Sequence, residues 1–229
     1  MANILITGAN RGIGLEFARQ YGEAGDRVFA TCRHPDEARE LQHLVERSKG
    51  RVTVHALDVT SDESVAATAS ELANETVDIL INNAGMGAGR GLHGRVDYDV
   101  WEVLLRVNTI GPHRVSLAFR PHLMKSKKRV IVTLSSVLGS IATNLAANST
   151  YSSSKAAVNR VMHRLATEWR DDGFVIVLLH PGWVKTDMGG PNATLDVEES
   201  VAGMRRIMAN LQPADSGRFL NHHGTDIPW

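Results

Sequence analysis

The sequence predicts one α/β domain in which a doubly wound parallel sheet is flanked by helices. Three observations support this prediction. Short strand-like segments alternate with longer helical patterns along the chain. Several of the strand-like segments are continuously apolar, as strands buried on both faces of a parallel sheet are. A glycine-rich turn follows the first strand and opens a helix, which is the arrangement of a Rossmann-type fold.

The expected elements follow one another in regular order. Strands are expected at residues 3–7, 27–31, 52–57, 77–81, 129–134, 174–179 and 218–221. The glycine-rich turn leads into the first helix, and further helices are expected at residues 36–46, 61–74, 98–124, 150–170 and 197–211. Ser61 is expected to cap its helix, and the long pattern at 98–124 is expected to bend near Pro112.

Composition excludes several classes of function. The chain has 229 residues, 43% hydrophobic and 22% charged, which fits a single soluble domain spanning residues 1–229. A formal net charge of zero gives no electrostatic case for nucleic acid or an anionic membrane. No apolar run approaches the ~20 residues that span a bilayer, and the first residues read as a strand and not as a leader.

Cysteine and histidine usage argues against metal and disulfide chemistry. Cys32 is the only cysteine, so a disulfide within the chain and a cysteine metal cluster are excluded. A lone cysteine fits the reducing cytoplasm, where we expect the protein to be located. The pair His222-His223 lacks a third ligand at a recognisable spacing, so no metal site is expected.

The glycine-rich turn at residues 7–14 (TGANRGIG) has the spacing T-G-x-x-x-G-x-G. Glycines at these positions let the chain turn sharply and bring backbone N–H groups close to a phosphate, at which the following helix points its positive end. The expected cofactor contacts in this turn are Gly8, Asn10, Arg11, Gly12, Ile13 and Gly14.

Five further motifs lie in matching order along the chain. Residues 82–85 read NNAG after the fourth strand, Asn108 lies within the long helical pattern, and Ser136 follows the fifth strand. Residues 151–155 read YSSSK, and Pro181-Gly182 follows the sixth strand. Together with the glycine turn, this series resembles the short-chain dehydrogenase/reductase family over most of the chain. Residues 180–190 (HPGWVKTDMGG) and 227–229 (IPW) resemble its C-factor and sniffer-type carbonyl reductase subgroup.

Tyr151 and Lys155 form the predicted reaction centre. Four residues apart on a helix, they share one face. Because an unperturbed tyrosine has a pKa of about 10, a nearby ammonium and the positive nicotinamide ring are expected to favour the phenolate. The resemblance implies a catalytic set of Asn108, Ser136, Tyr151 and Lys155. Ser135 is the rival to Ser136, but Ser136-Val-Leu-Gly fits the family pattern better. The segment from Ser136 to Tyr151 is longer than usual, and residues 144–148 are expected to bulge outward.

The end of the second strand favours NADP(H) over NAD(H). An NAD site usually places an acid there, whereas this chain has Thr31-Cys32-Arg33 and its nearest acid, Asp36, follows a proline. Arg33 would pair with the 2′-phosphate, and Arg11 would approach it. The resemblance adds further cofactor contacts at Asp58, Val59, Asn83, Ala84, Gly85, Tyr151, Lys155, Pro181, Gly182, Val184 and Thr186.

The sequence thus indicates an NADP(H)-dependent oxidoreductase, a carbonyl reductase or alcohol dehydrogenase acting on a small-molecule carbonyl or alcohol. The resemblance implies a homodimer or homotetramer, and an apolar face of the helix after Tyr151 would serve the core or an interface. One alternative is a C-factor-like nucleotide-binding signalling or regulatory protein with little turnover. A sugar-nucleotide epimerase or dehydratase is a third option, for which the part after Pro181 leaves little room.

Overall fold

A computed structural model describes residues 1–87, 96–143, 145 and 148–229 of the chain. Its centre is one seven-stranded sheet in the order β3-β2-β1-β4-β5-β6-β7, with every pair of neighbouring strands parallel. The strands are β1 (Asn3–Thr7), β2 (Arg27–Cys32), β3 (Val52–Ala56), β4 (Ile79–Asn82), β5 (Val130–Leu134), β6 (Val175–His180) and β7 (Phe219–Asn221). The strand order reverses between β1 and β4, and ligands of such sheets bind outside the carboxyl ends of the strands at this point.

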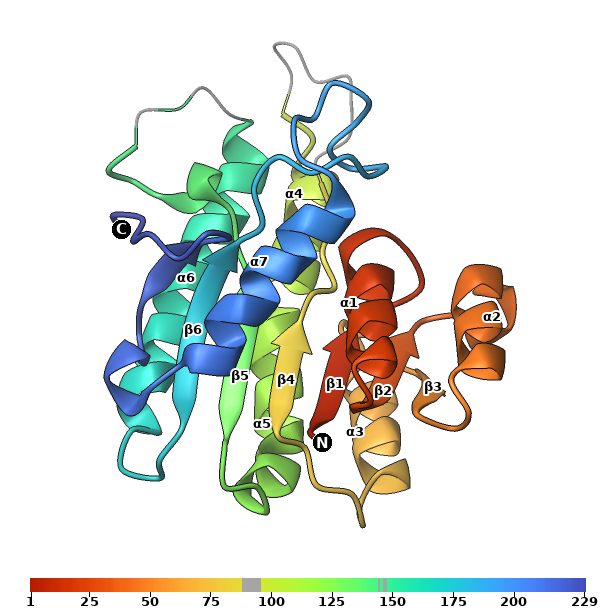
Figure 1. The fold of residues 1–229 in the computed structure, drawn as a ribbon. Coiled ribbons are helices and arrows are strands. Elements are labelled where there is room, and N and C mark those ends of the chain that lie inside the picture. Colours follow the sequence, from red (N-terminus) through yellow and green to blue (C-terminus); the bar gives the residue numbers. More distant parts are fainter. Residues whose placement is uncertain (88–95, 144, 146–147) are drawn as a thin grey trace.

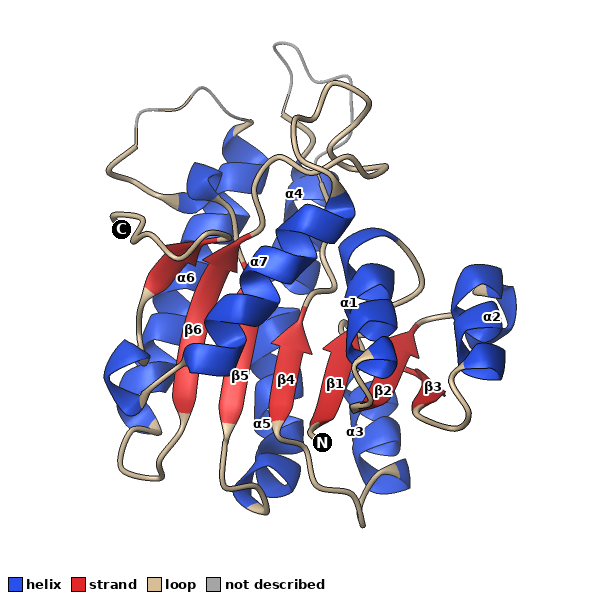
Figure 2. Ribbon diagram, viewed as in Figure 1, coloured by secondary structure: helices blue, strands red, loops and turns tan. Residues whose placement is uncertain are grey.

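Helices cover both faces of the sheet (Figure 2). They are α1 (Gly12–Glu23), α2 (Arg39–Arg47), α3 (Asp62–Glu71), α4 (Tyr98–Leu105), α5 (Gly111–Met124), α6 (Ser149–Glu168) and α7 (Val197–Asn210). Helices α1, α2 and α7 pack on one face, and α3, α5 and α6 pack on the other. In the described part of the chain, no helix is long and apolar enough to cross a membrane.

Each face of the sheet has its own hydrophobic core. Alternate residues of one strand enter opposite cores: in β6, Val177 belongs to the core under α1 and α7, and Ile176 to the core under α5 and α6. This explains why the strands read as continuously apolar. The apolar face of α6 is used in the same way, because Val158, Met162 and Leu165 are buried in the core of the chain itself.

The predicted strands are confirmed with ends that shift by one or two residues. Ser61 caps α3 as expected, its hydroxyl accepting from the Ser64 N–H at 3.1 Å. The helical pattern at 98–124 differs from the expectation of one bent helix. It consists of α4, a π-helical turn at Arg106–Ile110, and α5, so the break comes just before Pro112. Pro112 has no backbone N–H to donate within this continuous helical stretch.

Candidate active site

The turn between β1 and α1 is shaped by glycines at which a larger residue would not fit. Gly8 and Gly12 have φ angles of 66° and 53°, in the left-handed region that favours glycine. A Cβ on Gly14 would lie 2.3 Å from the Gly8 carbonyl oxygen and 2.4 Å from Asn83 Nδ2. Arg11 precedes α1 without a capping bond from its side chain, which leaves the positive helix end open to an anion. Asn10 is exposed beside it and Ile13 is half-buried.

The segment after β4 braces this turn. Thr7 Oγ1 accepts from the backbone N–H groups of Asn83 and Ala84, both at 3.0 Å. Asn83 Nδ2 donates to the carbonyl oxygens of Thr7 (2.8 Å) and Gly8 (2.9 Å). A Cβ on Gly8 would lie only 2.9 Å from the Ala84 Cα. Two motifs that are distant in the sequence are therefore in direct contact, and each fixes the backbone of the other.

Arg33 lies after β2, at the same edge of the sheet, and is exposed. Its charge acts on Asp58, after β3. Burial alone would raise the pKa of Asp58, but hydrogen bonds from Thr60 and the positive charge of Arg33 outweigh it, and the pKa is lowered. Val59 is buried against α5, where a Cβ on Gly111 would lie 2.9 Å from Val59 Cγ2.

The two serines after β5 have different partners. Ser135 Oγ donates to Asn159 Oδ1 on α6 at 2.5 Å, within the protein interior. Ser136 Oγ accepts from the Leu138 N–H at 3.2 Å, and the Ser136 side chain acts on the pKa of Tyr151. The structure thus places Ser136, and not its rival Ser135, beside the tyrosine.

Helix α6 carries both Tyr151 and Lys155, and the Asn148 side chain caps its first turn by accepting from the Thr150 N–H at 2.9 Å. Lys155 is only 7% exposed. Its Nζ donates to the Leu134 carbonyl oxygen at 2.9 Å and lies 5.8 Å from the centroid of the Tyr151 ring. Burial lowers the pKa of Lys155 to about 8. The ammonium form therefore predominates at neutral pH and is lost in mildly alkaline solution.

Among the groups of the chain itself, burial has the largest effect on the pKa of Tyr151. This pKa is raised and not lowered, because burial of the phenol outweighs the opposing effect of Ser136. Lys155 Nζ is directed at the Leu134 carbonyl oxygen and does not hydrogen-bond the phenol among the described contacts. Four-residue spacing on a helix brings the two residues together but does not by itself create a phenolate.

Asn108 lies in the π-helical turn Arg106–Ile110 and is 2% exposed. Its Oδ1 accepts from the Met86 N–H at 2.8 Å, and its Nδ2 donates to the Met86 carbonyl oxygen (2.9 Å) and to Ser154 Oγ (3.0 Å). It therefore ties the segment after β4 to helix α6. A Cβ on Gly85 would lie 3.5 Å from Asn108 Oδ1 and 3.8 Å from Lys155 Nζ, which places these groups around one point.

The loop after β6 packs against the glycine turn from the other side of the candidate site. Gly182 has a φ of 88°, and a Cβ there would lie 2.7 Å from Leu195 Cδ2. The loop then passes the glycine turn, where a Cβ on Gly12 would lie 3.4 Å from Thr186 Cγ2. Next along the loop, Asp187 Oδ2 accepts from Arg11 Nη1 at 2.8 Å, with both side chains exposed. Pro181 is half-buried, and Val184 is buried and pairs with Leu195.

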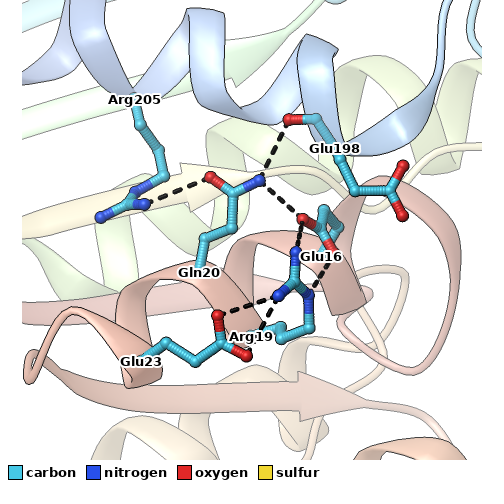
Figure 3. A network of polar contacts seen from close by, with 6 residues as sticks. All are labelled: Glu16, Arg19, Gln20, Glu23, Glu198 and Arg205. Carbon is cyan, nitrogen blue, oxygen red and sulfur yellow. Dashed lines mark hydrogen bonds and ion pairs between the residues drawn. The ribbon is translucent and has the colours of Figure 1, made fainter.

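A polar network joins α1 to α7, the helix that follows this loop (Figure 3). Gln20 stands at its centre: its Nε2 donates to Glu16 Oε1 (2.6 Å) and to the Glu198 carbonyl oxygen (3.1 Å), and its Oε1 accepts from Arg205 (3.2 Å). Glu16 is buried, so its negative charge needs a partner. Arg19 supplies one by donating two hydrogen bonds to the Glu16 carboxylate. The network fixes the start of α7, and hence the end of the loop, relative to the glycine turn.

Sequence reasoning missed four exposed apolar side chains on the loops at the carboxyl edge. Ile141, Leu145, Trp183 and Met188 are large apolar residues that remain exposed on the loops after β5 and β6. Met188 reaches the segment after β4, where a Cβ on Gly87 would lie 3.2 Å from its Cγ. The signal that could have found them is that apolar residues at these loop positions have no strand or helix to pack under.

All the predicted site residues in the described part of the chain lie at the carboxyl edge of the sheet, in the turns after β1 to β6 or at α4–α6 (Figure 1). Residues 144, 146 and 147 of the expected bulge, and residues 88–95 of the loop after β4, fall outside the described residues. Within the described ranges no cluster of three or more His, Cys, Asp or Glu side chains could hold a metal ion.

Comparison with known proteins agrees with this geometry. The family model described as short chain dehydrogenase matches residues 2–195. The C-signal protein of Myxococcus xanthus is 43% identical over 164 residues, which cover 71% of this chain and 99% of that protein. An NADPH-bound carbonyl reductase from chicken fatty liver has a TM-score of 0.93 and 36% identity, covering 100% of this chain and 99% of that one.

The carbonyl reductase Sniffer of D. melanogaster also superposes over 100% of both chains, with a TM-score of 0.93 and 29% identity. These likenesses cover the sheet, both helix layers and the loops at the carboxyl edge. With the family model, they show that this chain is an oxidoreductase with a Rossmann-type α/β fold, and that it belongs to the short-chain dehydrogenase/reductase family, near its C-factor and sniffer-type members.

Proposed function

We propose that the protein is an NADP(H)-dependent carbonyl reductase or alcohol dehydrogenase with Tyr151 as its general acid and base. The observation that carries the proposal is the convergence of Tyr151, Lys155, Ser136 and Asn108 beside a glycine turn built for a phosphate. A dinucleotide phosphate suits this turn, because the N-terminus of α1 has no side-chain cap and its backbone N–H groups can donate to an anion. When bound, the nicotinamide supplies or accepts the hydride.

Each member of the set has a distinct role in this proposal. Ser136 donates a hydrogen bond that holds the substrate oxygen next to the phenol. Tyr151, whose pKa is raised by burial, is protonated at neutral pH and can donate its proton to the oxygen during reduction. Lys155 supplies a buried positive charge that favours the phenolate left behind. Asn108 hydrogen-bonds the Met86 backbone and Ser154, and so fixes the segment after β4 relative to the helix that carries Lys155.

We further propose NADP(H) as the preferred cofactor. Arg33 is exposed at the end of β2, and Asp36, the nearest acid, lies in the separate turn Pro35–Glu37. Arg11 is on the glycine turn, with Asp187 as its partner. Two guanidinium groups at this edge suit a 2′-phosphate better than ribose hydroxyl groups alone. The NADPH bound to the chicken carbonyl reductase supports the same preference.

For the substrate, we propose a small carbonyl compound or alcohol that tolerates apolar surroundings, since Ile141, Leu145 and Met188 are exposed on the loops that follow β5 and β6. Family membership supports a homodimer or homotetramer, and the lone buried Cys32 suits the cytoplasm. The likeness to the C-signal protein favours one second candidate, a nucleotide-binding signalling protein with little turnover. Tight NADPH binding without oxidation of NADPH by any aldehyde or ketone would support that candidate.

The test of the proposed reaction is Tyr151→Phe. We expect turnover with a panel of aldehydes and ketones to fall by roughly 10²- to 10⁴-fold, while NADPH affinity, measured by fluorescence titration, stays within about twofold. Tyr21→Phe is the matched control, because Tyr21 is a buried tyrosine of α1 whose hydroxyl donates to Met208 Sδ, in the core on the other face of the sheet from α6. Near-normal turnover in Tyr151→Phe would remove the tyrosine from the reaction.

A further inference from the structure

The last residues of the sequence fold back along β7 and reach the loop that follows Ser136. After β7 the chain turns, with the Gly224 N–H donating to the Asn221 carbonyl oxygen and the Asn221 N–H to that of Thr225. The Ile227 N–H then donates to the Phe219 carbonyl oxygen at 2.8 Å, and the Ile227 side chain is buried. Residues 226–229 therefore run back toward the carboxyl edge, where the end marked C lies beside the loop between β5 and α6 (Figure 1).

Two hydrogen bonds join these residues to that loop. Ser140 Oγ donates to the Pro228 carbonyl oxygen at 2.6 Å, and the Ala142 N–H donates to the main-chain oxygen of Trp229 at 3.0 Å. Ser140 is only 6% exposed. Its hydroxyl also accepts from the Thr143 N–H at 3.3 Å, so a single side chain shapes the loop and ties it to residues 226–229.

The Trp229 ring anchors this arrangement. It makes an edge contact with His163 of α6, with ring centroids 4.9 Å apart, and it lies 5.6 Å from the Phe219 ring of β7. Helix α6 is the element that carries Tyr151 and Lys155. Residues 226–229 thus contact the sheet edge, the helix with the reacting tyrosine, and the loop that joins Ser136 to that helix.

We propose that residues 226–229 position the segment 140–143 as one wall of the substrate opening, with Trp229 and Ser140 as positioning residues. The wall has an apolar outer side, because Ile141 is 88% exposed between the two anchored residues. Only the expected rise in KM rests on the proposed function. The anchor itself is a property of the fold, and it is distant in sequence from the glycine turn that would hold NADPH.

A role in stability alone predicts a different result. If residues 226–229 only covered the edge strand β7, loss of the anchor would lower the melting temperature and leave the kinetic constants of the folded enzyme unchanged. If they position the wall, the Michaelis constant for the carbonyl substrate rises, while NADPH affinity stays the same. The backbone amide of Ala142 also exchanges faster with solvent, because the main-chain oxygen of residue 229 that accepts from it is no longer held in place.

The variants are Ser140→Ala, Trp229→Ala and Trp229→Phe. We expect KM for an aldehyde substrate to rise about three- to tenfold in the two alanine variants, as the loss of one hydrogen bond or one aromatic anchor implies. Trp229→Phe should recover most of the loss because it keeps an aromatic ring against His163. NADPH affinity should change by less than about twofold in all three.

Ser126→Ala is the matched control. Ser126 is a buried serine between α5 and β5, at the opposite edge of the sheet, and its hydroxyl donates to Asp78 Oδ1 at 2.5 Å. It should lose stability without any change in KM or in exchange at Ala142. Unchanged KM in both Ser140→Ala and Trp229→Ala would overturn the proposal.

Hydrogen exchange separates this proposal from the proposed function. If the wild-type protein turns over no carbonyl substrate, the proposed function fails, and the anchor is judged by exchange at residues 140–143 alone. Faster exchange there in Trp229→Ala than in Ser126→Ala supports the anchor, and equal exchange overturns it. If Trp229→Ala does not fold, Ser140→Ala carries the same comparison.

Discussion

At the level of single residues, burial acts on Tyr151 and Lys155 in opposite directions. It raises the pKa of the phenol and lowers that of the ammonium group to about 8, so it favours the neutral form of each. A catalytic pair needs the reverse, a charged lysine beside a tyrosine that can ionise. In the proposed mechanism the charge of a bound cofactor has to supply part of this shift, which links proton transfer to cofactor binding.

The residues that come together at the candidate site could be predicted better than the hydrogen bonds between them. Spacing alone predicted that Tyr151 and Lys155 share one helix face, and the family resemblance added Ser136 and Asn108. Their catalytic roles remain predictions, but the structure brings all four to the edge where the carboxyl ends of the parallel strands meet. The partners of these residues were not predicted. Ser154 bonds Asn108, and Asp187 pairs with Arg11, but contacts between side chains far apart in the sequence leave no periodic pattern to detect.

The exposed Arg33 provides a test of cofactor preference at this scale. For Arg33→Asp we expect kcat/KM with NADPH, divided by kcat/KM with NADH, to fall by roughly ten- to a hundredfold. This is the effect expected from losing one charge-assisted hydrogen bond to a phosphate. Steady-state kinetics with both cofactors measures the ratio. Arg47→Asp makes the same charge change on the exposed last turn of α2 and should leave the ratio unaltered. An unchanged ratio in Arg33→Asp would show that another group reads the phosphate.

At the level of elements, strands were easier to predict than helix irregularities. Buried parallel strands leave continuous apolar runs, so each of the seven was found to within one or two residues. The π-helical turn Arg106–Ile110 was not foreseen beyond a bend near Pro112. The turn carries Asn108, which contacts both Met86 and Ser154, and contacts between such distant segments leave no local sequence pattern.

The contact between the glycine turn and the segment after β4 gives a prediction for two elements together. A Cβ on Gly14 would overlap the Gly8 carbonyl oxygen and Asn83 Nδ2, so Gly14→Ala must push the turn away from its brace. We expect a loss of stability of about 1–3 kcal/mol and a fall in NADPH affinity of at least about tenfold. Chemical denaturation and fluorescence titration measure the two effects.

Gly25→Ala controls for stability alone. Gly25 has a φ of 89°, and a Cβ there would have nothing within 4 Å. The substitution strains the backbone in the turn after α1 but leaves the brace intact. It should reduce stability while NADPH affinity is kept. Equal NADPH affinity in Gly14→Ala and the wild type would show that the turn does not need its contact with Asn83.

At the level of the whole molecule, the strand order determines which sequence motifs lie next to one another. The reversal between β1 and β4 brings the glycine turn against the segment after β4, and β5 and β6 carry Ser136 and the closing loop to the same edge. Composition predicted a single domain without charge excess. It could not predict the return of residues 226–229 to this edge, because that path depends on the turn after β7 and on ion pairs of Arg218 with Asp226.

The histidines at the end of β6 and β7 make the stability of the fold depend on pH. Burial, together with the charges of His222 and His223, lowers the pKa of His180 from 6.5 to about 4. Its native form is therefore neutral. Between pH 6.5 and about 4, His180 is protonated in the unfolded chain and neutral in the folded chain. The free energy of unfolding that His180 contributes is therefore fully present above pH 6.5 and declines toward pH 4.

We expect the free energy of unfolding of the wild type to fall between about pH 7 and about pH 4.5, and His180→Asn to remove about 1–2 kcal/mol of that fall. Urea unfolding at the two pH values measures it, and the comparison uses the difference between pH values, so any constant cost of the substitution cancels. His43→Asn is the control, because the His43 side chain is 69% exposed and should leave the pH dependence as in the wild type. If both variants lose the same stability on acidification as the wild type, His180 is not held neutral by the fold, and the acid sensitivity belongs to other groups.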